Sequence, residues 1–495
     1  MPGLRSSVGS ARTMAAASWQ LARGRVFRPV VAAAAKKQEP RRTINVMTYN
    51  ILAEKYTLGG WHSYCPTQHL KWESRRARIL EEIESYDSDI ICLQEVEAGV
   101  FSELLQPWLQ QRGYRGHFQA RQYGENVQGA PEGVALFYRT SLFEPAHVHE
   151  FTFAAVQTDP PAPLSPWLSS SSSSSSDTED TSTTALVAPT PAAAATARGP
   201  NVRLATGFGA SSAATAAPAV ASSSLSSSSS SRAGGERRLG RGGGNSEFWS
   251  VFTRRQEGAI LALLRHRPSK RLLLAGVTHL FWNPAFPDVK AFQAAALCRE
   301  AAAFLRRHCG GSAAQEVPVV LAGDFNSLSR KCVPDVFDPK LPRGPEGLVS
   351  GVYALMTRGR LPPDHPDHPA SRRRPGETAN GDFRDVTLTS SGLRLASAYC
   401  LAHGRDPPLT TRTATFAGCL DYIFISPQHF EIESTLELPY DDPSSSYSTS
   451  TEGRSSRSWY DSVRDPLSDV AFTPIPDDVY PSDHLSLAAR LRLKD

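Results

Sequence analysis

A series of short apolar runs, each bordered by a polar residue, is the feature that most constrains the fold of this chain. The runs read "INVMTY", "DIICLQ", "LLLAGVT", "VPVVLAG", "DYIFIS" and "LSLAARLRL". Runs of this length between turn residues are typical of buried strands. Segments with helical spacing of apolar residues lie between them, at 69–86, 100–113 and 289–308. This alternation predicts an α/β fold around buried sheets.

The residues that border these runs are all able to bind a metal ion, move a proton or bond a phosphate. They are Asn50, Glu95, His279, Asp324, Asn326, Asp421, Asp483 and His484. Each one alone is more simply explained as a turn former or a solvated side chain. Strands that leave a sheet at one edge bring their ends together, however, so we expect these side chains to converge.

The residue types limit the chemistry of such a site. Carboxylates and carboxamides favour a hard cation, Mg²⁺ or alternatively Mn²⁺. Histidines beside carboxylates supply oriented proton transfer or stabilise charge on phosphoryl oxygens. The seven cysteines include no C-x-x-C pair, which argues against a zinc knuckle and a disulfide framework. The combination predicts metal-assisted attack of water on a phosphoester.

A segment poor in large apolar residues interrupts the pattern. Residues 157–246 consist mostly of Ser, Ala, Thr, Pro and Gly, which predicts a disordered insert within one domain that spans 43–495. Smaller loops are expected at about 358–384 and 440–478. Residues 1–42 are predicted to form a disordered leader. Its first 38 residues carry no Asp or Glu, so a transit peptide and a plain leader both remain open, and with them cytoplasm, plastid or mitochondrion.

Net charge and hydropathy bear on two further classes of protein, nucleic-acid-binding and membrane-spanning proteins. The net charge of +4 is too small to indicate nucleic-acid binding from bulk charge alone. The apolar runs fall far short of the roughly 20 residues that a membrane-spanning helix needs, so no membrane span is expected.

Six ordered motifs resemble those of the endonuclease/exonuclease/phosphatase superfamily. They are "TYNIL", "LQEV", "THLFWNP", "GDFNS", "LDYIF" and "PSDHLSL". The segments "YCPTQHLKWESRR" and "FWNPAFPDVK" are similar to the branch of carbon-catabolite-repressor-type deadenylases, nocturnin and Angel proteins. The resemblance covers about 43–155 and 247–495. It implies a four-layer α-β-β-α sandwich, in which two packed mixed sheets are flanked by helices.

The resemblance also implies a role for each residue. Glu95 would be the principal Mg²⁺ ligand, with Asn50 and Asp483 supporting the metal. Asp324 would orient and deprotonate the attacking water. The remaining roles are phosphate contact for Asn326, charge stabilisation for His279, an Asp–His pair for Asp421 and His484, and a clamp on the terminal adenine for Pro284 and Phe416.

The activity implied is 3′-to-5′ removal of poly(A) with release of 5′-AMP, the RNA 3′ end being the substrate. The same branch contains phosphatases that act on NADP(H) and on 2′,3′-cyclic phosphate ends, and these remain alternatives. A non-catalytic interaction protein is a third. Asn283 stands where many deadenylases have Asp, and no leucine-rich repeat is visible for docking to a scaffold complex.

Overall fold

Two large mixed β-sheets lie at the centre of the computed structural model. The structure describes residues 25–30, 42–121, 130–156, 247–332, 334, 337–338, 341, 347–372, 383–440, 470 and 472–495. The seven-stranded sheet has the order β1-β18-β19-β2-β3-β5-β4. Its strands are β1 (Phe27–Pro29), β2 (Thr43–Asn50), β3 (Ile90–Glu97), β4 (Tyr114–Ala120), β5 (Glu132–Arg139), β18 (Phe430–Leu436) and β19 (Leu487–Leu493).

The six-stranded sheet has the order β14-β17-β9-β8-β7-β6. Its strands are β6 (Phe143–Thr152), β7 (Gly258–His266), β8 (Leu272–His279), β9 (Val319–Asp324), β14 (Ala396–Ser397) and β17 (Asp421–Ile425). One parallel pair lies inside each sheet, β2 with β3 and β8 with β9, and the other pairings are antiparallel. Parallel neighbours end at the same sheet edge, so residues at the carboxyl ends of these strands become neighbours.

Three apolar layers hold the four structural layers together. One lies between the sheets and is built from inward-facing residues such as Val46, Ile90, Val277, Ile423 and Leu487. The other two lie outside the sheets, beneath the helices. Because successive side chains of a strand point to opposite faces, strands buried on both faces must be apolar at nearly every position. The continuous apolar runs of the sequence meet this requirement.

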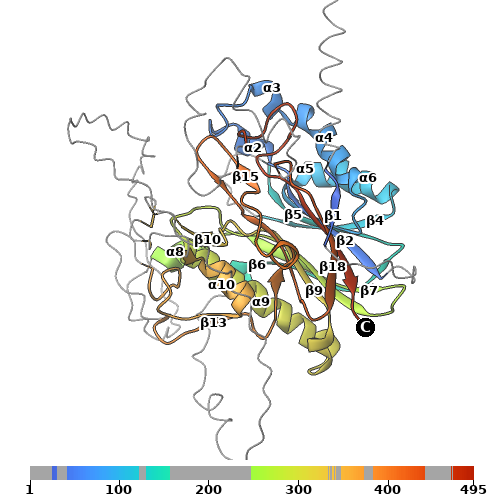
Figure 1. The fold of residues 1–495 in the computed structure, drawn as a ribbon, viewed down its shortest axis with the longest axis vertical. Coiled ribbons are helices and arrows are strands. Elements are labelled where there is room, and N and C mark those ends of the chain that lie inside the picture. The colour runs from blue at the N-terminus through green and yellow to red at the C-terminus, as the bar shows by residue number, and fades with distance from the viewer. Residues whose placement is uncertain are drawn as a thin grey trace, which may run out of the picture. The chain divides into compact units, whose positions relative to one another are not determined.

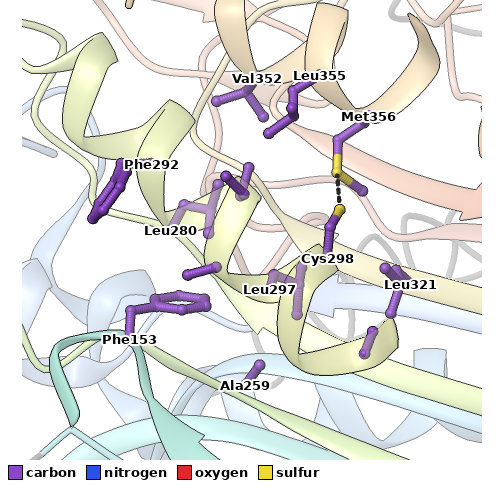
Figure 2. Close-up of a cluster of buried hydrophobic side chains, with 14 of the residues drawn as sticks. Phe153, Ala259, Leu280, Phe292, Leu297, Cys298, Leu321, Val352, Leu355 and Met356 are labelled. Atoms are coloured by element: carbon purple, nitrogen blue, oxygen red, sulfur yellow. Dashed lines mark hydrogen bonds between the residues drawn. The ribbon is translucent and has the colours of Figure 1, made fainter. Parts of the chain in front are cut away.

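Helices cover the outer face of each sheet (Figure 1). The seven-stranded sheet packs against α4 (Trp72–Ser85) and a helical segment formed by α5 (Ala98–Val100), η1 (Phe101–Leu105) and α6 (Gln106–Gln111). The six-stranded sheet packs against α8 (Glu247–Thr253), α9 (Pro287–Cys309) and α10 (Gly351–Arg358). In Figure 2, Leu297 and Cys298 of α9 and Leu355 and Met356 of α10 gather in one apolar cluster.

Short elements complete the described chain. The helices are α2 (Glu54–Thr57), α3 (Thr67–Leu70), α7 (Phe153–Val156), η3 (Ala313–Glu316) and α11 (Ala398–His403). The two-stranded pairs are β10 (Arg330–Lys331) with β11 (Leu348–Val349), β12 (Arg360–Leu361) with β13 (Leu388–Thr389), and β15 (Thr411–Arg412) with β16 (Ala417–Gly418).

The predicted architecture of two packed mixed sheets flanked by helices is confirmed. One detail differs from the sequence-based expectation: within the expected disordered leader, Arg25 is 7% exposed and β1 pairs with β18. The guanidinium of Arg25 donates to the carbonyl of Ser486 at 2.6 Å, so this short stretch is part of the fold. The expected insert at 157–246 lies outside the described residues. Among the described helices, none is long and apolar enough to cross a membrane.

Candidate active site

The polar residues that border the strands continue the apolar stripe between the sheets. On β8, Val277 lies in the inter-sheet core, and His279 occupies the next position on the same face. Ala322 and Asp324 stand in the same relation on β9. The same face is continued by Asn50 on β2 and Asp421 on β17. One end of the inter-sheet core is therefore polar.

Three of these residues are neighbours across adjacent strands. His279 pairs with Asp324 in the parallel ladder, and Asp324 pairs with Asp421 in the antiparallel ladder. The imidazole Nε2 of His279 lies 3.3 Å from Oδ2 of Asp324. Gly323 permits this pairing, because a Cβ at that position would lie 2.0 Å from the carbonyl oxygen of Thr278.

Asn50 and Glu95 join the cluster from the other sheet. The amide Nδ2 of Asn50 donates to Oδ2 of Asp324 at 3.2 Å and to Oε1 of Glu95 at 3.0 Å. The second carboxylate oxygen of Glu95 accepts from the backbone N–H of Ala53 at 3.0 Å. Glu95 lies at an irregularity of the β3–β5 ladder with φ 57°, a conformation that costs a non-glycine residue about 1–3 kcal/mol. Such strain is typical of functional sites.

His484 completes the cluster from the segment before β19. Its Nδ1 lies 2.8 Å from Oδ2 of Asp421 and 2.9 Å from the hydroxyl of Thr411. The hydroxyl of Thr410 donates to the same Asp421 oxygen at 2.5 Å. The other ring nitrogen of His484 lies 3.8 Å from Asp324. Asp421 and His484 thus form an oriented carboxylate–imidazole pair, as the family resemblance implies.

Burial and charge act in opposite directions on these groups. Burial by itself would raise the pKa of Asp324, but His279 and His484 hold this pKa well below its ordinary value. Burial opposes protonation of His484, yet Asp421 and Asp324 raise its pKa well above 6.5. Both pKa shifts favour the charged forms of the two groups, an imidazolium at His484 and a carboxylate at Asp324.

A second carboxylate lies near Glu95. Burial raises the pKa of Glu95, and the charge of Asp483 raises it further. Burial would also raise the pKa of Asp483, but its hydrogen bond to His62 and the charge of His484 lower it. The Nε2 of His62 lies 3.2 Å from Oδ2 of Asp483. Glu95 and Asp483 are both partly buried, and two acidic groups that repel each other favour a bound cation, which would relieve their repulsion.

Three buried polar atoms of the cluster have no hydrogen-bond partner within the described part of the chain. They are Nδ1 of His279, Oδ1 of Asp421 and Oδ1 of Asp483. Leaving a buried polar atom without a partner costs about 1–3 kcal/mol, so a ligand that bonds them is favoured. Donor atoms of Asp324, Asp421 and His484 also lie within 4.8 Å of one another. A protonated His484 has no lone pair for a metal ion, so the atoms suited to a hard cation such as Mg²⁺ are the carboxylate oxygens of the cluster, among them those of Glu95 and Asp483.

Asn326 lies beside this cluster and is held by its neighbours. Its backbone N–H donates to Oδ1 of Asp324 at 2.8 Å, and its side-chain amide donates to the carbonyl of Leu280 at 2.9 Å. Its own carbonyl accepts from Nζ of Lys290 at 2.7 Å. Lys290 also donates to the carbonyl of Trp282, and burial lowers the pKa of its amine to about 7. This amine ties together the loops that follow β8 and β9.

The two residues expected to clamp a base lie on loops. Pro284 is exposed on the loop after β8, and Phe416 is 37% exposed in the turn between β15 and β16. The exposure of Phe416 shows that its ring is not a core side chain.

Several residues that shape the site escaped the sequence analysis, among them His62, Arg75, Lys290, Thr410 and Thr411. Arg75 and Lys290 stand inside motifs that marked the resemblance, "WESRR" and "PDVK". Their partners are carbonyl groups, which a sequence pattern does not reveal. His62 precedes "YCPT" and is a lone histidine, which is more often a solvated or core residue.

Comparisons with known proteins agree with this geometry. A model of the Endonuclease/Exonuclease/phosphatase family matches residues 47–484. The chain is 26% identical over 468 residues to a Danio rerio protein, CCR4-NOT transcription complex subunit 6-like, covering 91% of this chain and 63% of that protein. It is 23% identical over 458 residues to the Saccharomyces cerevisiae CCR4-Not complex 3′-5′-exoribonuclease subunit Ccr4, covering 91% and 39%. The chain thus spans less than two thirds of the length of either relative.

A solved structure shares the fold. The crystal structure of ANGEL2, a 2′,3′-cyclic phosphatase, in complex with adenosine-2′,3′-vanadate matches with a TM-score of 0.54 and 18% identity. The match covers 95% of this chain and 98% of ANGEL2 in that structure. These findings confirm the superfamily and the branch that the motifs indicated. The chain belongs to the Endonuclease/Exonuclease/phosphatase family.

Proposed function

We propose that this protein is a divalent-cation-dependent 3′-to-5′ exoribonuclease that shortens poly(A) ends and releases 5′-AMP. The observation that carries the proposal is the meeting of Asn50, His279, Asp324 and Asp421 at one end of the inter-sheet core. These residues come from both sheets, so the fold itself assembles the site. The exoribonuclease name of the yeast relative supports the substrate class.

Residues on one side of the site are suited to hold the cation. Glu95 would be the principal ligand and Asp483 would support it, because both offer carboxylate oxygens. Asn50 would support the metal by holding Glu95 in place through its amide hydrogen bond. Mg²⁺ fits this donor set, and Mn²⁺ is an alternative. When bound, such an ion offsets the charge that develops on the phosphate and on the departing 3′-oxygen.

Residues on the other side are suited to activate water and to stabilise the phosphoryl group. Asp324 is ionised, so it accepts a hydrogen bond from the attacking water and receives its proton. The protonated His484 is held by Asp421 and directs its second ring nitrogen towards Asp324. His279 places an unsatisfied, buried Nδ1 at the same site, where it stabilises charge on a phosphoryl oxygen. Asn326 orients Asp324 through its backbone N–H and offers its remaining amide hydrogen to the phosphate.

Purified protein is expected to shorten 5′-labelled oligo(A) with Mg²⁺ and to stop when a chelator is added. Parallel reactions with oligo(U), NADP(H) and an RNA with a 2′,3′-cyclic phosphate end separate the alternatives. Release of phosphate from NADP(H), or opening of the cyclic end with no shortening of oligo(A), replaces the exoribonuclease proposal by the corresponding phosphatase. A protein inert towards all four substrates would be an interaction protein.

Phe416→Ala is expected to lower the preference for oligo(A) over oligo(U) without changing stability. Stacking of an aromatic ring on a base contributes about 1–3 kcal/mol, so kcat/KM on oligo(A) should fall by about 5- to 150-fold. The preference for A over U should fall by a smaller factor, because only the difference in stacking strength between the two bases contributes to it. The ring is partly exposed and lies against Gly418, so its removal leaves no cavity in the core. Leu401→Ala, another exposed apolar truncation, is the matched control and should leave the preference unchanged. An unaltered ratio of kcat/KM values in Phe416→Ala would remove Phe416 from base recognition.

A further inference from the structure

Two exposed tryptophans meet beside the candidate active site. Trp61 is 70% exposed and Trp282 is 54% exposed, although indole rings are normally largely buried. Their ring centroids lie 6.5 Å apart with an interplanar angle of 68°. The two residues are far apart in the sequence, one after α2 and one after β8. No role in the proposed reaction has been given to either ring.

Both rings are attached to parts of the site that are held firmly. Trp61 lies against Gly59, where a Cβ would come within 3.0 Å of the indole. The next residue, His62, is buried and hydrogen-bonded to Asp483. The position of the Trp61 backbone is thus tied to the acidic side of the site.

Trp282 is tied to the opposite side. It follows His279 by three residues, and its carbonyl accepts a hydrogen bond from the buried Lys290 at 3.3 Å. The preceding Phe281 is 2% exposed and anchors the loop in the core. An indole that is exposed on a fixed backbone loses little conformational freedom when it binds a partner, so it is well suited to recognition.

The two indole rings are chemically suited to bind a nucleobase. Indole faces stack on nucleobases with about 1–3 kcal/mol per base, and this contact is tolerant of sequence because every base has a π face. When the 3′ end of a single-stranded RNA occupies the site, the rest of the strand must pass over the edge of the site. Each of its nucleotides carries a base with a π face that could stack there. An apolar protein segment could also cover these rings. The substrate strand is the better candidate, because it must pass beside the site in the proposed reaction.

We propose that Trp61 and Trp282 form a stacking platform for a base of the single-stranded RNA upstream of the terminal nucleotide. This proposal rests on the proposed function, since it places the substrate strand at the edge of the site. The platform is separate from the clamp expected of Pro284 and Phe416, which concerns the terminal base.

Binding of labelled oligo(A) in the presence of chelator, where no chain is cleaved, tests the platform. Trp61→Ala and Trp282→Ala are each expected to weaken binding of an oligo(A) several nucleotides long by about 5- to 150-fold. Binding of AMP, which has no upstream base, should not change. Trp61→Phe and Trp282→Phe should keep most of the affinity. Trp61→Leu and Trp282→Leu should not, because leucine is apolar but has no π face. Leu401→Ala is the control for an exposed apolar truncation.

The outcomes separate the platform from the activity. Equal affinity of the parent protein and both alanine variants for oligo(A), or no measurable binding by the parent, overturns the platform. Affinity of the leucine variants as high as that of the phenylalanine variants also overturns it and indicates apolar docking. Tryptophan-dependent binding by a protein that cleaves no RNA supports the platform and rejects the exoribonuclease. Cleavage of oligo(A) by a protein whose binding does not depend on the tryptophans supports the exoribonuclease and rejects the platform.

Discussion

Glu95→Ala is expected to reduce turnover on oligo(A) by about 10³-fold or more while the protein remains folded. The substitution removes the carboxylate proposed as the principal cation ligand, and loss of a single preorganised electrostatic contact in an active site already costs about 10²–10³-fold. Burial raises the pKa of Glu95, so its ionised form is costly to the fold. Removal of this charge should therefore leave the midpoint of thermal unfolding unchanged or slightly raised.

Glu97→Ala is the matched control, because Glu97 belongs to the same strand and its carboxylate also accepts from a backbone N–H, that of Lys55. Both variants lose one such contact, but only Glu95 bonds Asn50 within the cluster. Turnover and the unfolding midpoint are measured for both proteins over a range of Mg²⁺ concentrations. Near-normal turnover of Glu95→Ala at saturating Mg²⁺ would falsify the assignment of Glu95 as principal ligand.

The sequence predicted the centre of the fold better than its edges. The strands β8, β9 and β17 and most of β7 appear as continuous apolar runs because both of their faces are covered, and β19 keeps enough apolar residues to be recognised although two arginines interrupt it. The polar residues at their ends were recognisable because they interrupt those runs. Side chains two positions apart on a strand lie on the same face, so the polar residue that comes two positions after a core residue also lies on the inter-sheet face.

The outer strands carried a weaker signal. The strands β4, β6 and β18 are only partly buried, and their sequences mix charged, aromatic and small residues. Their pairing partners decide that they are strands, and pairing is a tertiary effect. The strand β1 was missed for the same reason, since three residues of an otherwise basic and alanine-rich segment give no periodic pattern.

The supporting contacts of the site were also beyond the sequence. His62 and Thr411 form hydrogen bonds with Asp483 and His484, which lie far along the chain, and Thr410 donates to Asp421 on a neighbouring segment. No spacing rule connects such partners. Lys290 and Arg75 act on backbone carbonyls, and every residue has one, so the partner cannot be read from residue type.

Arg75 is the largest of these omissions, because its guanidinium joins three segments of the chain. The side chain is fully buried in α4. Its Nε donates to the carbonyl of Leu70 at 2.8 Å, and its terminal nitrogens donate to the carbonyls of Ile51, Leu52 and Pro481 at 2.8–3.1 Å. The carbonyls of Ile51 and Leu52 follow Asn50, and the carbonyl of Pro481 precedes Asp483. The guanidinium of Arg75 therefore positions both sides of the candidate site.

Arg75→Met is expected to lower the free energy of unfolding by about 3 kcal/mol or more. Methionine occupies a similar volume but donates no hydrogen bond, so four carbonyls lose a donor, and each buried group left unsatisfied costs about 1–3 kcal/mol. Relief of the buried charge offsets part of this cost. Urea unfolding of Arg75→Met and of Arg76→Met provides the measurement. Arg76 is exposed on the same helix, so its replacement should change stability by about 0.5 kcal/mol or less.

Measuring turnover of the Arg75→Met protein shows whether Arg75 only stabilises the fold or also positions the site. If the guanidinium only stabilises the fold, Arg75→Met at a temperature where it remains folded will turn over oligo(A) like the parent protein. If it positions the site, kcat will fall further than the unfolded fraction explains, because the backbone N–H that holds Glu95 belongs to Ala53, next to Leu52. Equal stability of Arg75→Met and Arg76→Met would mean that water or other groups satisfy the four carbonyls, and that the segments after β2 and before β19 are held by their apolar contacts instead.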